Sequence, residues 1–206
     1  MQTVAKLARR AGLSALFLVA AAPALAGQPV LSDPLNVWPL NFGTQNNAIL
    51  AKNNAVHILA PANGALWAIY SGFDFTDMDA SVTITPNTAT GSAAGLLFWA
   101  TGASDFFDFS VSEVNGTMAV YKHVSTANPQ WQAIVPYMKT NLLKQQGPNV
   151  LRLVTKNNYI TLYINGEWAG AVSAMGPQAG GAVGIEGEGS AKGPGDYAFA
   201  NLTVSQ

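Results

Sequence analysis

The sequence predicts an all-β protein, built as an antiparallel sandwich or barrel, and three observations support this. About a dozen short strand-like runs lie close together in the sequence, and several of them alternate apolar and polar residues, which is typical of strands with one buried face. Turn residues separate them, and Asn165-Gly166 is the clearest case, because a type I′ hairpin turn needs positive φ at both central residues. Charged residues make up only 10% of the chain, whereas long amphipathic helices need a charged face.

The clearest strands lie at 149–172, where Asn157-Asn158 and Asn165-Gly166 join three runs. Their alternation directs one set of side chains to the core: Leu151, Leu153, Ile160, Leu162 and Ile164. Further strands are expected at 49–59 (a pair that turns at Asn53-Asn54), 65–70, 80–85, 95–101, 106–111, 117–124, 131–135, 181–186 and 197–204. A helical turn is expected only at 138–146.

Residues 1–26 have the pattern of a secretory signal peptide. A basic start that includes Arg9-Arg10 precedes an apolar run at 11–22, and residues 24–26 read Ala-Leu-Ala, a small-x-small cleavage pattern. The apolar run is too short for a bilayer, which needs about 20 residues. We therefore expect cleavage after residue 26, one domain at 27–206, no membrane span after cleavage, and a periplasmic or secreted protein.

Charge and composition argue against several kinds of partner, against disulfides and against a metal site. Without residues 1–26 the chain keeps seven basic and eleven acidic residues, a net charge of −4, which argues against nucleic acid or anionic membrane as a partner. Cysteine is absent, so no disulfide is expected. His57 and His123 lack the spacing of metal ligands, and the acids at 74, 77 and 79 suit turns and strand entries, so no metal site is predicted.

The same alternation assigns side chains to the outer face of the strands. If Phe107 and Phe109 point inward, their neighbours point outward, and the rule applies to every strand. The outward set contains Trp99, Phe106, Asp108, Tyr121, His123, Arg152 and Tyr163. Exposed aromatic patches mark binding sites, and rings beside polar groups suit sugars. Alternatively, a loop or the N-terminal lead-in covers this face, and these residues form a second small core.

Few acidic residues lie in strands where they could catalyse glycoside hydrolysis. Glycoside hydrolysis needs two carboxyl groups facing each other across the bond. In a hydrolase, Asp108 would be the general acid or base, Arg152 would orient it or bind a substrate oxygen, and His123 would be the third candidate. The alternative is that Asp108 is a solvated strand residue. Glu186 and Glu188 are interpreted as the edge of a flexible loop.

Several motifs follow one another in an order that resembles the concanavalin A-like jelly rolls. They are Ala94-Gly95-Leu96-Leu97-Phe98, Phe107-Asp108-Phe109-Ser110-Val111, Trp131, Asn149-Val150-Leu151-Arg152-Leu153, Ile160 to Gly166, Gly181-Ala182-Val183-Gly184-Ile185 and Phe199 to Val204. Over about residues 31–206 the chain is similar to the laminin-G-like and 3-keto-disaccharide hydrolase domains of bacterial exported proteins. The resemblance implies a two-sheet antiparallel jelly-roll β-sandwich, a fold that hosts lectins, glucanases, carbohydrate-binding modules and adhesion domains.

The chain departs from that pattern in two places. In many members the last strand reads Phe-Asp-Asn; here Ala200 replaces the Asp, which argues against their structural calcium, and no cofactor is expected. The Glu-x-Asp-x-x-Glu strand of the retaining glucanases is missing, and Glu186-Gly187-Glu188 is the nearest run. The leading hypothesis is a non-catalytic domain that binds a carbohydrate or cell-envelope glycan. The alternatives are a glycoside hydrolase acting on (keto-)disaccharides or related glycosides, and a structural or adhesion module without a small ligand.

Overall fold

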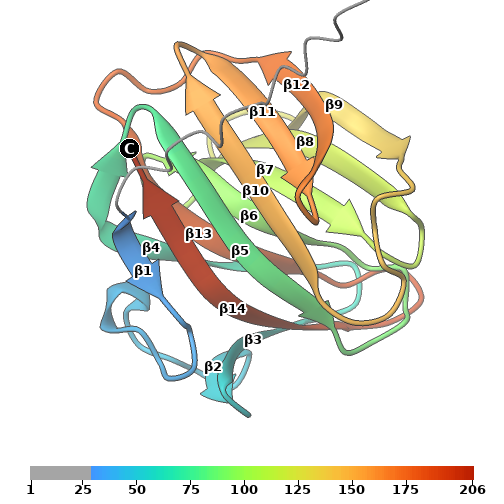
Figure 1. Ribbon diagram of the computed structural model, residues 1–206. Helices are drawn as coiled ribbons and strands as arrows, with labels where there is room; N and C mark the ends of the chain where they lie inside the picture. Colours follow the sequence, from blue (N-terminus) through green and yellow to red (C-terminus); the bar gives the residue numbers. More distant parts are fainter. Residues whose placement is uncertain (1–28) are drawn as a thin grey trace, which may run out of the picture.

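The computed structural model describes residues 29–206, in which two antiparallel sheets pack face to face (Figure 1). The all-β, jelly-roll prediction is confirmed. The predicted signal peptide at 1–26 lies outside the described residues. No helical segment within 29–206 has the length and apolar character needed to cross a membrane.

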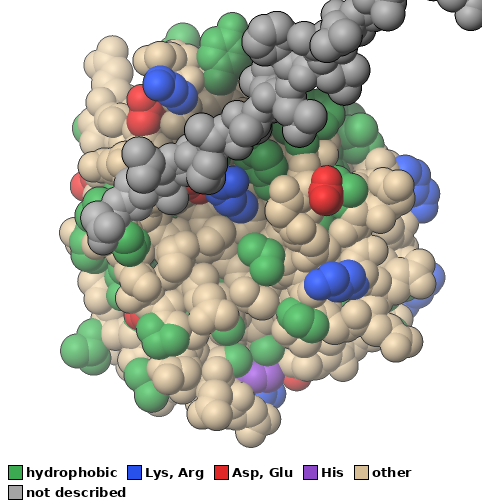
Figure 2. Space-filling model, viewed as in Figure 1, with side chains coloured by type: hydrophobic (Ala, Val, Ile, Leu, Met, Phe, Trp, Pro, Cys, Tyr) green, Lys and Arg blue, Asp and Glu red, His purple; other side chains and the backbone are tan. Residues whose placement is uncertain are grey.

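The larger sheet has the strand order β12-β11-β10-β5-β14-β3-β2, with β1 paired to β14 beside β3. Its strands are β1 (Pro29–Asp33), β2 (Ile49–Lys52), β3 (Ala55–Ala60), β5 (Met78–Pro86), β10 (Asn149–Lys156), β11 (Tyr159–Ile164), β12 (Glu167–Ser173) and β14 (Gly195–Ser205). Figure 2 views this sheet from outside, and charged side chains on that face are scattered rather than gathered into a patch.

The smaller sheet has the order β4-β13-β6-β7-β8-β9. Its strands are β4 (Ala65–Phe75), β6 (Ala94–Ala100), β7 (Asp105–Ser112), β8 (Thr117–Val124), β9 (Trp131–Lys139) and β13 (Gly181–Glu188). In Figure 1 it lies behind β5, β10 and β14. One face of this sheet packs against the larger sheet, and its other face is the outer face.

The expected turns occur where the sequence predicts them. Asn157 and Asn158 join β10 to β11 with φ of 50° and 66°, and Asn165 with Gly166 join β11 to β12 with φ of 54° and 85°. Asn53 and Asn54, with φ of 51° and 59°, join β2 to β3. Positive φ at both central residues is the mark of the type I′ turn, which matches the twist of the flanking strands.

One local prediction is wrong. Residues 138–146, expected to form a helical turn, complete β9 at Lys139 and then continue as an irregular loop. Side chains hold that loop instead: Asn149 accepts from the backbone N–H of Lys144 and donates to its carbonyl, at 2.9 and 3.0 Å. Within the described residues the helical element is η1 (Leu40–Phe42), a single 3₁₀ turn.

The main core lies between the two sheets. The five side chains predicted to point inward from β10 and β11 are buried there, with exposed fractions of 0–1%. Phe107, Phe109 and Val111 from β7 meet them from the smaller sheet. The register of β7 is thereby fixed, because a slip of one residue would turn Phe109 outward and Asp108 into the core.

Candidate functional site

Three carboxylates gather on the outer face of the smaller sheet. Asp108 points outward from β7, as predicted, because Phe107 and Phe109 on either side of it point into the core. Glu186 and Glu188 point outward from β13, because Ile185 is in the core and a Cβ at Gly187 would meet Ile58 there. The two glutamates are therefore strand residues, and their interpretation as the edge of a flexible loop is wrong.

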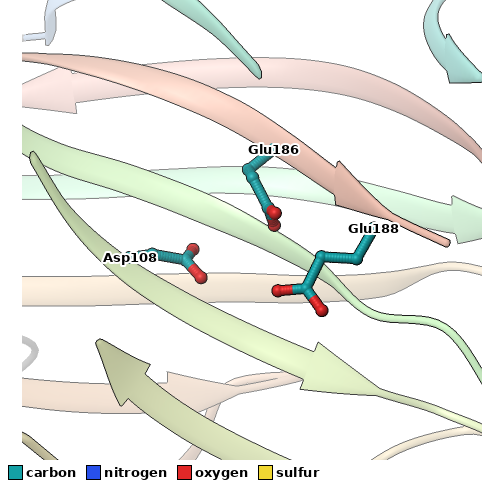
Figure 3. A group of neighbouring side chains, drawn as sticks. All are labelled: Asp108, Glu186 and Glu188. Atoms are coloured by element: carbon teal, nitrogen blue, oxygen red, sulfur yellow. The ribbon is translucent and has the colours of Figure 1, made fainter. Parts of the chain in front are cut away.

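The three side chains converge (Figure 3), and their nearest carboxylate oxygens all lie within 4.8 Å of one another. Asp108 and Glu186 are fully buried, each with 0% of its surface exposed. None of their four carboxylate oxygens has a hydrogen-bond partner among residues 29–206. Glu188 is partly exposed at the end of β13. Asp108 is thus not the solvated strand residue that a polar outward position suggests.

A glycine on the intervening strand makes this convergence possible. Gly95 on β6 lies opposite Glu186 on one side and opposite Ser110 on the other. A Cβ at residue 95 would lie only 1.9 Å from Oδ1 of Asp108. The Asp108 carboxylate therefore occupies the space that any other residue at position 95 would fill, and it reaches toward β13 across the bare backbone of β6.

The carboxyl groups of the cluster have raised pKa values. Burial raises the pKa of Asp108 and of Glu186 well above the usual range, and the negative charge of Glu188 raises both further. Burial also raises the pKa of Glu188. The ion pairs within residues 29–206 lie elsewhere: Lys52 and His57 with Asp196, and Arg152 with Asp79. No basic side chain among the described residues pairs with the cluster.

Two adjoining hollows, here called the groove, open above these carboxylates. Their volumes are about 420 and 400 Å³, and Tyr137, Glu188 and Gly189 line both. The first is completed by Asn63, Gly64, Ala65, Tyr121 and Trp131, and the second by Ser92, Ser112, Asn115, Lys139 and their neighbours. Tyr121, predicted to face outward as a ligand-binding residue, is thus in the wall of the groove.

Tyr137 separates the two hollows. It projects from β9, 41% of its surface is exposed, and its hydroxyl forms a 3.1 Å hydrogen bond with the Ser110 hydroxyl on β7. β8 lies between them and carries Ala119 opposite Ser110, so a small side chain lies along the path of the ring. Burial and then the charge of Glu188 raise the pKa of Tyr137, which keeps its hydroxyl protonated. No pattern in the sequence marks Tyr137 as a site residue.

Phe106 and His123 face outward as predicted but are buried, with 1% and 4% of their surfaces exposed. Phe106 forms a small outer cluster with Leu97, Ala100 and Ala182, against which Trp67 and Trp131 pack. The His123 ring stacks on Phe106, with centroids 5.1 Å apart, and its Nδ1 contacts the carbonyl of Ser104. These two residues therefore form the second small core that was the alternative to an exposed patch.

Trp131 packs against the outer cluster and also lines the groove. Its ring lies 4.6 Å from the His123 ring, centre to centre, and 6.2 Å from that of Tyr121. The side chain thus contacts the buried outer cluster and is also part of the groove wall. It belongs with Tyr121 and Tyr137 as the third aromatic residue of the groove.

The assignment of Trp99 to the outer face is wrong. Trp99 has φ of 51°, which breaks the alternation of β6, and its ring packs with Phe98 and Phe107 in the main core. Its Nε1 donates to the carbonyl of Thr76 at 2.8 Å. Strict alternation holds only for extended backbone, so a residue in the left-handed region turns its side chain to the opposite face.

The assignment of Arg152 and Tyr163 to the same face as Asp108 is also wrong, because β10 and β11 belong to the larger sheet. Arg152 donates from Nε and Nη2 to the Asp79 carboxylate at 2.7 and 2.6 Å, and its guanidinium lies 4.9 Å from the centre of the Tyr163 ring. Asp108, His123 and Arg152 therefore do not form one catalytic group. Whether Arg152 or Tyr163 binds a ligand on its own sheet stays a prediction.

No protein-family model and no curated protein matches the chain. Solved structures do. The carbohydrate-binding module CBM66 from Bacillus subtilis is 14% identical, with a TM-score of 0.63 over 78% of this chain and 92% of that one. The jelly-roll β-sandwich fold is therefore confirmed.

Two further jelly rolls extend the comparison. A Bacillus licheniformis β-glucanase is 9% identical, with a TM-score of 0.60 over 85% of this chain and 97% of that one. The carbohydrate recognition domain of Emp47p is 11% identical, with a TM-score of 0.61 over 89% and 98%. At these sequence identities, the similarity to solved structures shows a shared fold and does not show a shared function.

Proposed function

We propose that this jelly roll is an exported, periplasmic or secreted, carbohydrate-binding domain, and that the groove on the outer face of its smaller sheet is the sugar site. The observation that carries the proposal is the lining of the groove. Tyr121, Trp131 and Tyr137 offer ring surface beside the partly exposed carboxylate of Glu188. Rings stack on the apolar faces of sugars, while polar groups bind hydroxyls.

The dimensions of the groove and the similar folds support the same class of ligand. Each hollow, at about 400 Å³, is within the size range of small-ligand sites. Two hollows that share Tyr137 suit a chain of sugar units rather than one ring. A carbohydrate-binding module and a carbohydrate recognition domain have this fold. A cell-envelope glycan is the ligand we propose, in keeping with the expected export.

Replacing Trp131 by alanine is expected to weaken glycan binding at least tenfold, because the largest ring in the wall of the groove is lost. The wild type is first screened on an array of plant and bacterial cell-wall oligosaccharides, and its best ligand is then titrated calorimetrically. Trp168→Ala is the matched control, since Trp168 is 64% exposed on β12 of the other sheet. Binding by no glycan, or equal losses in both variants, would overturn the proposal.

A glycoside hydrolase is the second candidate, favoured by carboxylates within 4.8 Å of one another beside a groove. Retaining hydrolases place two carboxyl groups about 5–5.5 Å apart, both in contact with the sugar. Here Asp108 and Glu186 are fully buried, and only Glu188 lines the groove. We therefore expect binding without release of reducing sugar. Turnover by the wild type that Glu188→Gln abolishes would establish the hydrolase instead.

A further inference from the structure

The three-carboxylate cluster has no partner within the described protein that accounts for it. Asp108 and Glu186 are buried, and all four of their carboxylate oxygens lack hydrogen bonds within residues 29–206. No basic side chain among these residues forms an ion pair with them. A buried carboxylate is costly unless it is paired, hydrogen-bonded or bound to a metal. The cluster therefore requires either bound protons or a bound cation.

We propose that Asp108, Glu186 and Glu188 form a binding site for a calcium-like divalent cation. All three donors are hard oxygens, the ligands that calcium takes at about 2.3–2.6 Å. Two oxygens bound to one such ion can be at most about 5 Å apart, twice that bond length. The cluster meets this limit, since one oxygen from each of the three residues lies within 4.8 Å of the other two. Zinc would instead favour nitrogen and sulfur donors.

The glycine at position 95 allows the Asp108 carboxylate to reach the cluster. Gly95 contributes no side chain where the Asp108 carboxylate lies, so the oxygens converge without a clash. Figure 3 shows the three side chains directed at a common centre from two strands. Since β13, β6 and β7 are neighbours in the middle of the smaller sheet, the donors are mounted on rigid backbone rather than on a loop.

The groove supplies the remaining ligands. Calcium takes six to eight oxygens, more than three carboxylates provide in single contacts. Glu188 is partly exposed and lines both hollows, so the ion would be open to water on that side. This cation position is separate from Ala200 on β14, where the family resemblance would place an aspartate.

Calcium titration of the chelator-treated protein at pH 7.5 tests the proposal, and no glycan is needed. The wild type should bind one ion per chain, measured by calorimetry, and its melting temperature should rise. Asp108→Asn and Glu186→Gln keep the side-chain shape and should weaken binding at least tenfold. Asp74→Asn is the control, because Asp74 is exposed on the neighbouring strand β4 and should change nothing.

A second measurement avoids the variants, in case they fail to fold. Terbium bound in the cluster should emit when Tyr137 and Trp131 nearby are excited, and calcium should displace it. The site is supported if both amide variants lose calcium binding. It is also supported if the wild type shows terbium emission that calcium quenches. A folded wild type that binds neither calcium nor terbium, or amide variants that bind as tightly as the control, would overturn it and leave a proton-sharing cluster.

Discussion

Replacing Gly95 by alanine is expected to lower the free energy of unfolding by about 1–3 kcal/mol, the usual cost of overpacking a well-packed interior. The new Cβ would lie 1.9 Å from Oδ1 and 2.8 Å from Cγ of Asp108, and 3.1 Å from the backbone oxygen of Phe109. The Asp108 side chain has to move, although it is fully buried. The convergence with Glu186 and Glu188 should be lost as well.

Urea denaturation followed by circular dichroism measures this change, with Gly102→Ala as the matched control. A Cβ at residue 102 would have no atom within 4 Å, so the control should stay within about 0.5 kcal/mol of the wild type. The proposed calcium affinity should fall with Gly95→Ala and remain with Gly102→Ala. Equal stability of the two variants would show that the sheet adjusts to a side chain at position 95.

The free energy of unfolding is expected to fall as pH rises from about 4.5 to 7, through ionisation of Glu113. This residue follows β7, is 1% exposed, and has one oxygen without a hydrogen-bond partner in the described part of the chain. Burial raises its pKa from 4.5 to about 7. Between these values the folded protein keeps a proton that the unfolded chain has lost, so rising pH favours unfolding. The loss amounts to roughly 3 kcal/mol, complete above pH 7.

Denaturation curves at pH 5, 6, 7 and 8 in chelator-treated buffer provide the measurement. Glu113→Gln should flatten the pH dependence and should be more stable than the wild type at pH 8. Glu167→Gln is the control, because Glu167 is exposed on β12. Asp108, Glu186 and Glu188 change stability in the same direction, so some slope should remain in Glu113→Gln. Identical slopes in wild type and Glu113→Gln would contradict the assignment.

The faces of single strands could be predicted from the sequence, because alternation is a local property. Asp108, Tyr121 and His123 all point outward for that reason. Trp99 does not follow the rule, since its positive φ depends on packing that no local pattern shows. The choice of sheet is also non-local: Arg152 and Asp108 have equivalent local patterns but lie on opposite sides of the sandwich.

The convergence of the carboxylates could not be predicted from spacing along one strand. Glu186 and Glu188 come from β13 and Asp108 from β7, and β6 lies between the two strands. A search for three acids within one strand therefore misses them. The available signal was the alternation Glu186-Gly187-Glu188 directly after an apolar strand, which fits a continued strand as well as a loop. Tyr137 gave no signal, because its role depends on a hydrogen bond to Ser110, 27 residues away in the sequence.

The pairing of β14 also constrains the order in which this chain can assemble. β14 lies between β5 and the pair β1 and β3, and β4 is held in its sheet only through β13. Both sheets thus join strands that lie before residue 76 to strands after residue 180. Contacts so distant in sequence form slowly. Neither layer can close until nearly all of residues 29–206 have been synthesised, because each needs a strand that follows residue 180.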